Sequence, residues 1–201
     1  MNKGLKVGCG IGVFITVVII GFVLWGVGVY NSLVSLDEGV TQAWSQVENQ
    51  YQRRADLIPN LVNTVKGVAN FEKETYTAVA KARASAGQIK LTPQMLSDPN
   101  AFSKFQAAQD NLGSALSRLM VTVEKYPQLK ANENFLQLQA QLEGTENRIA
   151  VERRKYNKIV QEFNTKIRRF PANAIAGFGG FTAKQYFRAA KSAEKVPEVK
   201  F

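Results

Sequence analysis

Residues 30–74 read YNSLVSLDEGVTQAWSQVENQYQRRADLIPNLVNTVKGVANFEKE, and this stretch decides the fold. Its large apolar residues recur at intervals of three and four with a single gap, as one face of a 3.6-residue helix requires. We therefore predict one long amphipathic helix whose apolar face is covered by the rest of the chain. The residues of this face are Leu33, Leu36, Val40, Trp44, Val47, Tyr51, Ile58, Leu61, Val65 and Val68.

Two residues interrupt this regular pattern. Pro59 has no backbone N–H, so we expect it to kink the helix or to divide it. Arg54 fills the gap in the apolar face, between Tyr51 and Ile58. Because a buried, unpaired charge is very unfavourable, its guanidinium should have a carboxylate or carbonyl partner elsewhere in the fold.

An uncharged apolar run from Val7 to Val29 precedes this helix. As a helix it is about 35 Å long, which is enough to cross a bilayer with some tilt. A cleaved signal peptide is the alternative, but its apolar core is normally about 7 to 15 residues long and ends at a small-x-small site. Residues 26–28, Gly-Val-Gly, form a poor site of that kind. We therefore predict an uncleaved transmembrane anchor.

The charges beside the apolar run predict its orientation. The amino terminus, Lys3 and Lys6 precede it, whereas Asp37 and Glu38 are the first charges after it. The positive-inside rule places the amino-terminal tail in the cytoplasm. The part of the chain after the span then lies on the extracytoplasmic side of the cell (inner) membrane. We expect a cytoplasmic tail at 1–6, a single-pass transmembrane helix at 7–30, a helical bundle at 31–194 and a flexible tail at 195–201.

Two further helices follow, each with an apolar face of three-and-four spacing. The first begins at Asp98 as N-cap with Pro99 at the first helical position, and the second begins near Asn132. The first face comprises Phe102, Phe105, Leu112, Leu116, Leu119, Val123 and Tyr126, with Gln109 at its polar gap. The second comprises Phe135, Leu138, Leu142, Ile149, Tyr156, Ile159, Phe163, Ile167 and Phe170, with Thr145 and Glu152 as its polar members.

The remaining segments connect or follow these helices. Gly87 and the segment 88–100 predict a loop or crossover after the small-residue stretch 78–86. A glycine-rich turn at 174–181 then precedes a short helix predicted from about Thr182 to Glu194. The fold class is therefore all-α: an N-terminal transmembrane helix followed by an antiparallel bundle of three long helices plus a shorter C-terminal helix.

The composition argues against several kinds of chemistry. The chain has no histidine and a single cysteine, Cys9, so it offers no Ser–His or Cys–His pair, no His-ligated metal and no intrachain disulfide. Its net charge is +10, but the basic residues are dispersed without a nucleic-acid motif, so we expect a solvated surface and no nucleic-acid partner. The neighbouring carboxylates Glu143 and Glu146 are more simply solvated or paired than catalytic. We predict no enzyme, no cofactor and no metal.

Two stretches carry a family resemblance. QRRADLIPNLV at 52–62 and LEGTENRIAVERRKYN at 142–157, within a likeness that covers residues 30–181, resemble the LemA family of bacterial membrane-anchored proteins. The resemblance implies a single amino-terminal span and an α-helical bundle, in a family without an established enzymatic activity. It also implies partners, because genes of this family often neighbour those of membrane metalloproteases and a magnetosome relative is tied to membrane organisation.

Both stretches are charged where the surrounding faces are apolar, and antiparallel packing would bring them face to face. We interpret them as an interhelix polar network of salt bridges and amide bonds that fixes the register of the helices. A polar binding groove is the alternative. The predicted network comprises Arg53, Arg54, Asp56, Glu143, Glu146, Asn147, Arg153, Arg154, Tyr156 and Asn157.

From these features we expect a non-enzymatic, membrane-anchored helical adaptor or scaffold that binds envelope proteins or itself. The candidate partners are an envelope protein, with a membrane metalloprotease as the one that the resemblance implies, and further copies of the chain. The alternative function is a membrane-remodelling oligomer that acts directly on anionic lipid through its basic faces.

Overall fold

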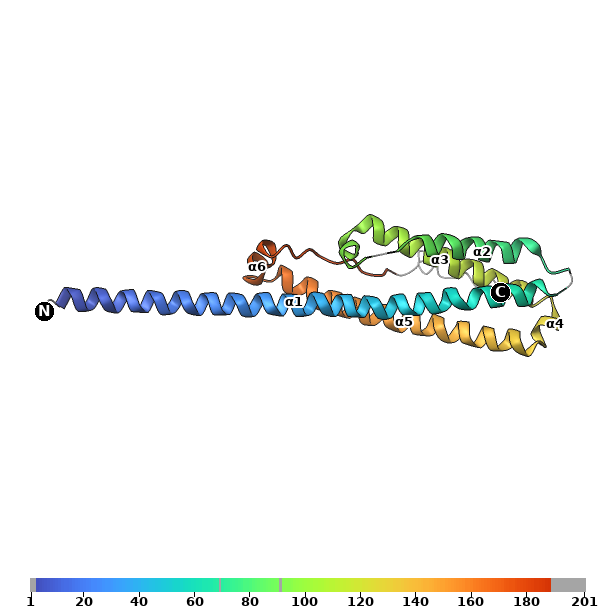
Figure 1. Cartoon of the computed structure of the whole chain (residues 1–201), viewed down its shortest axis with the longest axis horizontal. Helices are drawn as coiled ribbons and strands as arrows, with labels where there is room; N and C mark the ends of the chain where they lie inside the picture. The colour runs from blue at the N-terminus through green and yellow to red at the C-terminus, as the bar shows by residue number, and fades with distance from the viewer. Residues whose placement is uncertain (1–2, 69, 91, 189–201) are drawn as a thin grey trace, which may run out of the picture.

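The computed structural model describes residues 3–68, 70–90 and 92–188. Within these ranges the chain contains helices and connections and no strand. The elements are α1 (Lys3–Lys66), α2 (Lys73–Gln88), the 3-10 helix η1 (Pro93–Ser97), α3 (Pro99–Val123), α4 (Pro127–Lys130), α5 (Glu133–Arg168) and α6 (Ala172–Phe178). The all-α antiparallel bundle with three long helices, α1, α3 and α5, is confirmed (Figure 1).

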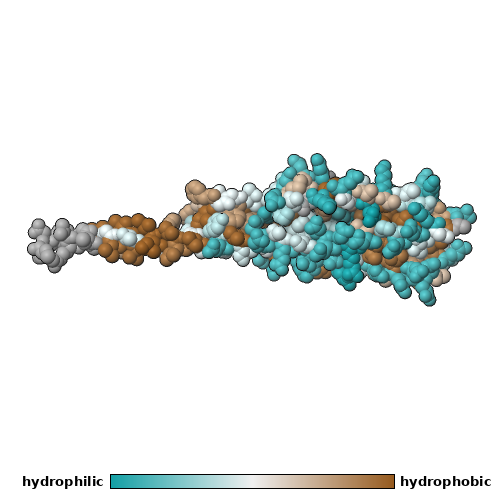
Figure 2. Space-filling view, in the orientation of Figure 1, coloured by the Kyte–Doolittle hydropathy of each residue, from teal (hydrophilic) through white to brown (hydrophobic). Residues whose placement is uncertain are grey.

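The amino-terminal apolar run and the central amphipathic stretch form one continuous helix, α1, of 64 residues. A segment of α1 reaches a mean hydropathy of 2.5 and is not buried at all. By length and composition α1 is the one helix among the described residues that is suited to cross a membrane. It projects far beyond the bundle (Figure 1), and its projecting part is hydrophobic while the bundle surface is mainly hydrophilic (Figure 2).

The rest of α1 packs lengthwise on α5, and α2 packs on α3 (Figure 1). Two clusters of buried side chains fill the space between these helices. The cluster farther from the projecting helix is mainly aliphatic and includes Ile58, Leu61, Leu119 and Phe135. The nearer cluster is rich in aromatic residues and includes Trp44, Tyr51, Phe102, Phe105, Tyr156, Phe163 and Phe187.

Pro59 lies inside α1 and does not divide it. Because proline has no N–H, the carbonyl of Ala55, four residues earlier, loses its helical donor. In its place, Nε of Arg83 in α2 donates a hydrogen bond of 2.7 Å to this carbonyl oxygen. A side chain of the neighbouring helix thus satisfies the group that the proline leaves without a partner.

The central helix ends earlier than predicted. α1 stops at Lys66 rather than near Glu74, and the connection contains Asn70 in a left-handed conformation with φ of 63°. Asparagine tolerates this conformation better than most residues, so it suits a chain reversal. The small-residue stretch 78–86, which precedes the predicted loop, lies within α2, where Val79 and Ala86 are buried.

The carboxyl-terminal region also differs from the prediction. The predicted helix from Thr182 is wrong in its described part, because residues 181–188 form no helix and run as an extended connection (Figure 1). Residues 189–194 and the predicted tail 195–201 lie outside the described residues. A short helix, α6, stands instead where the glycine-rich turn was expected. Phe170, predicted on an apolar inner face, is 86% exposed, because α5 ends at Arg168 and the helical periodicity ends with it.

Side chains of α5 hold the extended segment by its main chain. The amide of Asn164 donates to the carbonyl of Lys184 and accepts from its N–H, both at 2.9 Å. Asn157 makes the same pair of bonds, also at 2.9 Å, with Phe187. These bonds satisfy main-chain groups that a helix would otherwise pair internally, so the segment can remain extended.

Candidate functional site

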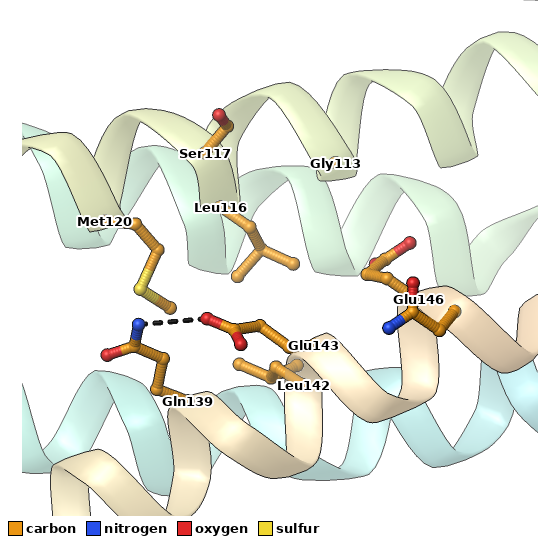
Figure 3. Close-up of a pocket in the computed structure, with 9 residues that line it drawn as sticks. Gly113, Leu116, Ser117, Met120, Gln139, Leu142, Glu143 and Glu146 are labelled. Carbon is orange, nitrogen blue, oxygen red and sulfur yellow. Dashed lines mark hydrogen bonds between the residues drawn. The ribbon is translucent and has the colours of Figure 1, made fainter.

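A groove lies between α3 and α5, with a cavity volume of about 500 Å³ (Figure 3). We call it the α3–α5 groove. Leu116, Met120 and Leu142 supply apolar surface, and carboxylates and amides stand beside them, so the groove combines an apolar floor with a polar rim. Its lining residues are Gly113, Leu116, Ser117 and Met120 of α3 and Gln139, Leu142, Glu143, Glu146 and Asn147 of α5.

The two carboxylates of the groove are held from different sides. The side chain of Gln139 donates to the carboxylate of Glu143 at 3.0 Å, within α5 (Figure 3). Glu146 instead accepts a hydrogen bond of 2.7 Å from Nη1 of Arg54, which reaches it from α1. Both carboxylates are therefore oriented, while each remains exposed to solvent at the groove.

Arg54 is 3% exposed and has partners on α3 and on α5. Besides its bond to Glu146, Nη2 donates to the side-chain oxygen of Gln109 and, at 3.4 Å, to the carbonyl of the same residue. Its guanidinium also lies 5.1 Å from the ring centre of Tyr51. The cation that interrupts the apolar face of α1 thus links α1, α3 and α5 at one level of the bundle.

A second cluster of polar contacts surrounds Arg153, beside the buried cluster that is rich in aromatic residues. Nε of Arg153 donates to the hydroxyl of Tyr51 at 2.6 Å, and Nη2 lies 3.5 Å from the carboxylate of Asp110. The guanidinium also stacks 4.8 Å from the ring centre of Phe187. Burial raises the pKa of Tyr51, and the positive charge of Arg153 opposes this rise. The hydroxyl therefore remains protonated at neutral pH.

The structure divides the residues predicted as one network among several places. Arg54 meets Glu146, whereas Arg153 belongs to the second cluster, with Tyr51 and Asp110. The hydroxyl of Tyr156 donates to the carbonyl of Gln185 at 3.1 Å, and Asn157 binds the main chain of Phe187. Glu143 and Asn147 line the groove, Asp56 accepts from Gln52 at 2.8 Å, and Arg53 and Arg154 are exposed. That these contacts fix the helix register stays a prediction.

Sequence reasoning missed three of the residues that make these contacts. Asp110 pairs with Arg153, Arg83 caps the carbonyl freed by Pro59, and Asn164 binds the extended segment. Asn164 carried a usable signal, because it follows Asn157 by seven residues and so returns to the same side of α5 after two turns. The sequence gives no comparable signal for Arg83 and Asp110, since their contacts depend on the relative rotation of packed helices.

The groove has the chemistry of a binding surface. Among the residues that the structure describes, no three His, Cys, Asp or Glu side chains gather as a metal site would require. Of the two groove carboxylates, Glu146 is already paired with a guanidinium and Glu143 with an amide. They can accept hydrogen bonds or a positive charge from a ligand that lies over the apolar floor.

Comparison with known proteins places this geometry in a family. The sequence profile of the LemA family matches residues 43–201. The chain belongs to the LemA family. The matched region contains every residue of the α3–α5 groove and begins after the apolar part of α1. The LemA-family assignment therefore covers most of the bundle.

Similar proteins include magnetosome and LemA proteins. "Magnetosome protein MamQ 2" of Paramagnetospirillum magneticum is 29% identical over 175 residues, covering 79% of this chain and 64% of the relative. Magnetosome protein MamQ of Magnetospirillum gryphiswaldense is 28% identical over 174 residues, with the same shares covered. Protein LemA of Metamycoplasma hominis is 28% identical over 150 residues, covering 75% of this chain and 64% of the relative. The chain thus spans somewhat less than two thirds of each of these LemA-family relatives.

Proposed function

We propose that this LemA-family protein is a non-enzymatic, membrane-anchored adaptor that holds another envelope protein in its α3–α5 groove. The observation that carries the proposal is the groove itself, with its apolar floor and two oriented carboxylates on a chain whose net charge is +10. Membrane attachment is supported by the exposed apolar part of α1, which continues without a break into the bundle. We place the bundle outside the cytoplasm, in accordance with the charges that flank the apolar run.

The chemistry of the groove favours an amphipathic helix as its occupant. A channel between two helices suits a third helix that inserts apolar side chains between them. Leu116, Met120 and Leu142 would receive a leucine, methionine or phenylalanine of the partner, and methionine adapts well to such side chains. Glu143 would pair with a lysine or arginine one turn away on the same partner helix.

The bonds that hold the carboxylates also prepare them for binding. Arg54 fixes Glu146 from the core, so this side chain loses little rotamer freedom when a partner binds. Gln139 orients Glu143 in the same way, but it is neutral and leaves the negative charge available. The free charge of the groove is therefore concentrated at Glu143.

Site-specific crosslinking in native membranes tests this proposal. A photoreactive residue in place of Ser117, in the groove, should capture one heterologous envelope protein, and the same residue in place of the exposed Thr77 of α2 should not. The crosslinked peptide should come from a basic amphipathic helix. A membrane metalloprotease, the partner class implied by the resemblance, is one candidate for the captured protein.

A synthetic peptide of the captured helix provides the quantitative test. It should bind the full-length protein with a salt-dependent Kd, and Glu143→Lys should weaken binding by about tenfold or more, which corresponds to about 1.4 kcal/mol. Binding that is indifferent to Glu143→Lys would contradict the proposed use of the groove. Crosslinks exclusively between copies of the chain would indicate a homo-oligomeric scaffold, and crosslinks exclusively to lipid would favour the membrane-remodelling alternative.

A further inference from the structure

The connection after α5 and the helix α6 carry the two most exposed aromatic side chains among the described residues. Phe178 is 96% exposed and Phe170 is 86% exposed, although the bundle buries most of its other phenylalanines. Both lie in the segment 168–181, which we call the foot of the bundle. Two large apolar side chains exposed to water in one short segment are unfavourable, so we ask where the foot lies relative to the membrane.

Contacts with α1 fix the level of the foot. The side chain of Ile175 in α6 lies against Gly26 of α1. A Cβ atom at position 26 would be 3.8 Å from Cδ1 of Ile175. The ring of Phe181 meets the ring of Tyr30 with their centres 5.7 Å apart. The apolar run of α1 ends at Val29, between these two contacts. The foot therefore stands beside the last turns of the membrane span.

The register of α1 against α5 gives the level of the charges that precede the foot. Ile159 of α5 lies against Gly39 of α1. Because the helices are antiparallel, nine residues forward along α5 and nine residues back along α1 bring Arg168 level with Tyr30. Arg168 and Arg169 are both exposed. Arg168 and Arg169 thus lie at the level at which α1 passes from apolar to polar residues.

The composition of the foot suits the boundary between lipid chains and headgroups. Residues 170–183 contain no charged side chain, and Arg169 and Lys184 flank them. At the same level α1 carries the partly exposed Trp25 and Tyr30, residue types that are enriched at membrane interfaces. The hydrophobic surface of the projecting helix continues onto the adjoining end of the bundle before hydrophilic surface predominates (Figure 2).

We propose that the foot is a second membrane contact, which inserts Phe170 and Phe178 into the boundary between acyl chains and headgroups of the bilayer that α1 spans. Arg168 and Arg169 bind lipid phosphate there, because guanidinium groups match phosphate oxygens in a bidentate manner. Its occupant is the lipid surface and not a protein, since the patch continues the lipid-facing surface of α1 directly. This contact goes beyond the adaptor function and restricts the tilt of the bundle relative to the membrane.

Depth-dependent fluorescence quenching tests this proposal on the full-length chain. In a Cys9→Ser background, Phe178→Cys carries a fluorescent label, and the protein is reconstituted in vesicles of equimolar phosphatidylglycerol and phosphatidylethanolamine. Val121→Cys is the matched control, because Val121 is also apolar and exposed, at 68%, but lies beside α4 at the opposite end of the bundle (Figure 1). Both substitutions are at exposed positions, so the fold should persist.

We expect lipids brominated near the headgroup to quench the label at position 178 and aqueous iodide to leave it largely unaffected, with the reverse at position 121. Equal quenching by iodide at both positions, without quenching by brominated lipid at 178, would overturn the proposal. In the Arg168→Glu and Arg169→Glu double variant, most of the bromolipid quenching at 178 should be lost. Unchanged quenching in that variant would overturn the assignment of the two arginines to lipid phosphate.

Discussion

Nη1 of Arg54 and the carboxylate of Glu146 are 2.7 Å apart, but the two side chains differ greatly in exposure: 3% for the arginine and 44% for the glutamate. Because of this asymmetry, the loss of either side chain leaves the other in a very different environment. Without Arg54, the glutamate would simply be solvated. Without Glu146, a guanidinium would remain buried with only neutral hydrogen-bond partners.

Glu146→Ala should therefore lower the free energy of unfolding by about 2 kcal/mol, because the buried cation of Arg54 loses its carboxylate. Urea unfolding of the full-length chain in detergent, followed by circular dichroism, measures this change. Glu143→Ala, one turn away on the same helix, is the matched control and should change the free energy by less than about 0.5 kcal/mol. Equal effects of the two substitutions would show that Arg54 does not need the charge of Glu146.

Arg83→Met should lower the free energy of unfolding by about 1 to 2 kcal/mol, because the carbonyl of Ala55 loses the side-chain donor that replaces the N–H missing at Pro59. In a Pro59→Ala background the helix supplies its own donor, so the same substitution should have a much smaller effect. A double-mutant cycle gives this coupling directly. Additive effects would mean that Arg83 stabilises the helix pair by some other contact.

Phe187→Ala should lower the free energy of unfolding by about 3 kcal/mol, because the buried ring of Phe187 packs against both Trp44 and Phe102 in the aromatic-rich cluster. The neighbouring Tyr186 is 38% exposed, and Tyr186→Ala should have an effect below about 1 kcal/mol. Hydrogen exchange supplies a local readout, since the amides of Lys184 and Phe187 should lose protection in Phe187→Ala. Full protection of these amides in that variant would show that the asparagine bonds alone hold the segment.

Stability should fall as the pH rises above about 10, the ordinary tyrosine pKa. Burial raises the pKa of Tyr156 well above this value and also raises the pKa of Tyr51. The folded chain therefore holds these protons more tightly than the unfolded chain, so its stabilisation is complete below pH 10 and is lost above it. Denaturant midpoints measured from about pH 9 to about pH 11 should show a shallower decline for Tyr156→Phe than for Tyr186→Phe. Parallel declines would contradict this assignment.

Much of the bundle could be predicted because side-chain periodicity reports directly on which face of a helix is buried. Trp44, Leu112 and Phe163, taken from the three predicted apolar faces, are all buried in the structure. The interruption at Arg54 likewise predicted that a carboxylate or carbonyl must approach it, and both Glu146 and the carbonyl of Gln109 do so. The pairing of a specific glutamate depends on helix rotation, which the sequence pattern does not specify.

The carboxyl-terminal region could not be predicted because distant contacts override its local preferences. Residues 182–194 have a composition that favours a helix, but Asn157 and Asn164 bind the main chain of the described part in an extended form. Phe170 continued an apolar periodicity that no longer applies once α5 has ended at Arg168. Glu143, Glu146 and Asn147 were predicted as part of a polar network or groove, and they line the α3–α5 groove. The apolar floor of the groove and its wall on α3 could not be predicted, since they arise from the spacing between α3 and α5.

The unbroken course of α1 has a consequence for which neighbours can meet the groove. Arg54, at the level of Glu146, follows Val29 by 25 residues, and a helix rises about 1.5 Å per residue. When α1 stands upright, the groove is thus held about 38 Å above the edge of the lipid chains. Small membrane proteins that barely emerge from the bilayer would pass beneath it. Under the proposed function, the length of this helix therefore sets the height above the membrane at which the helix of a partner must lie.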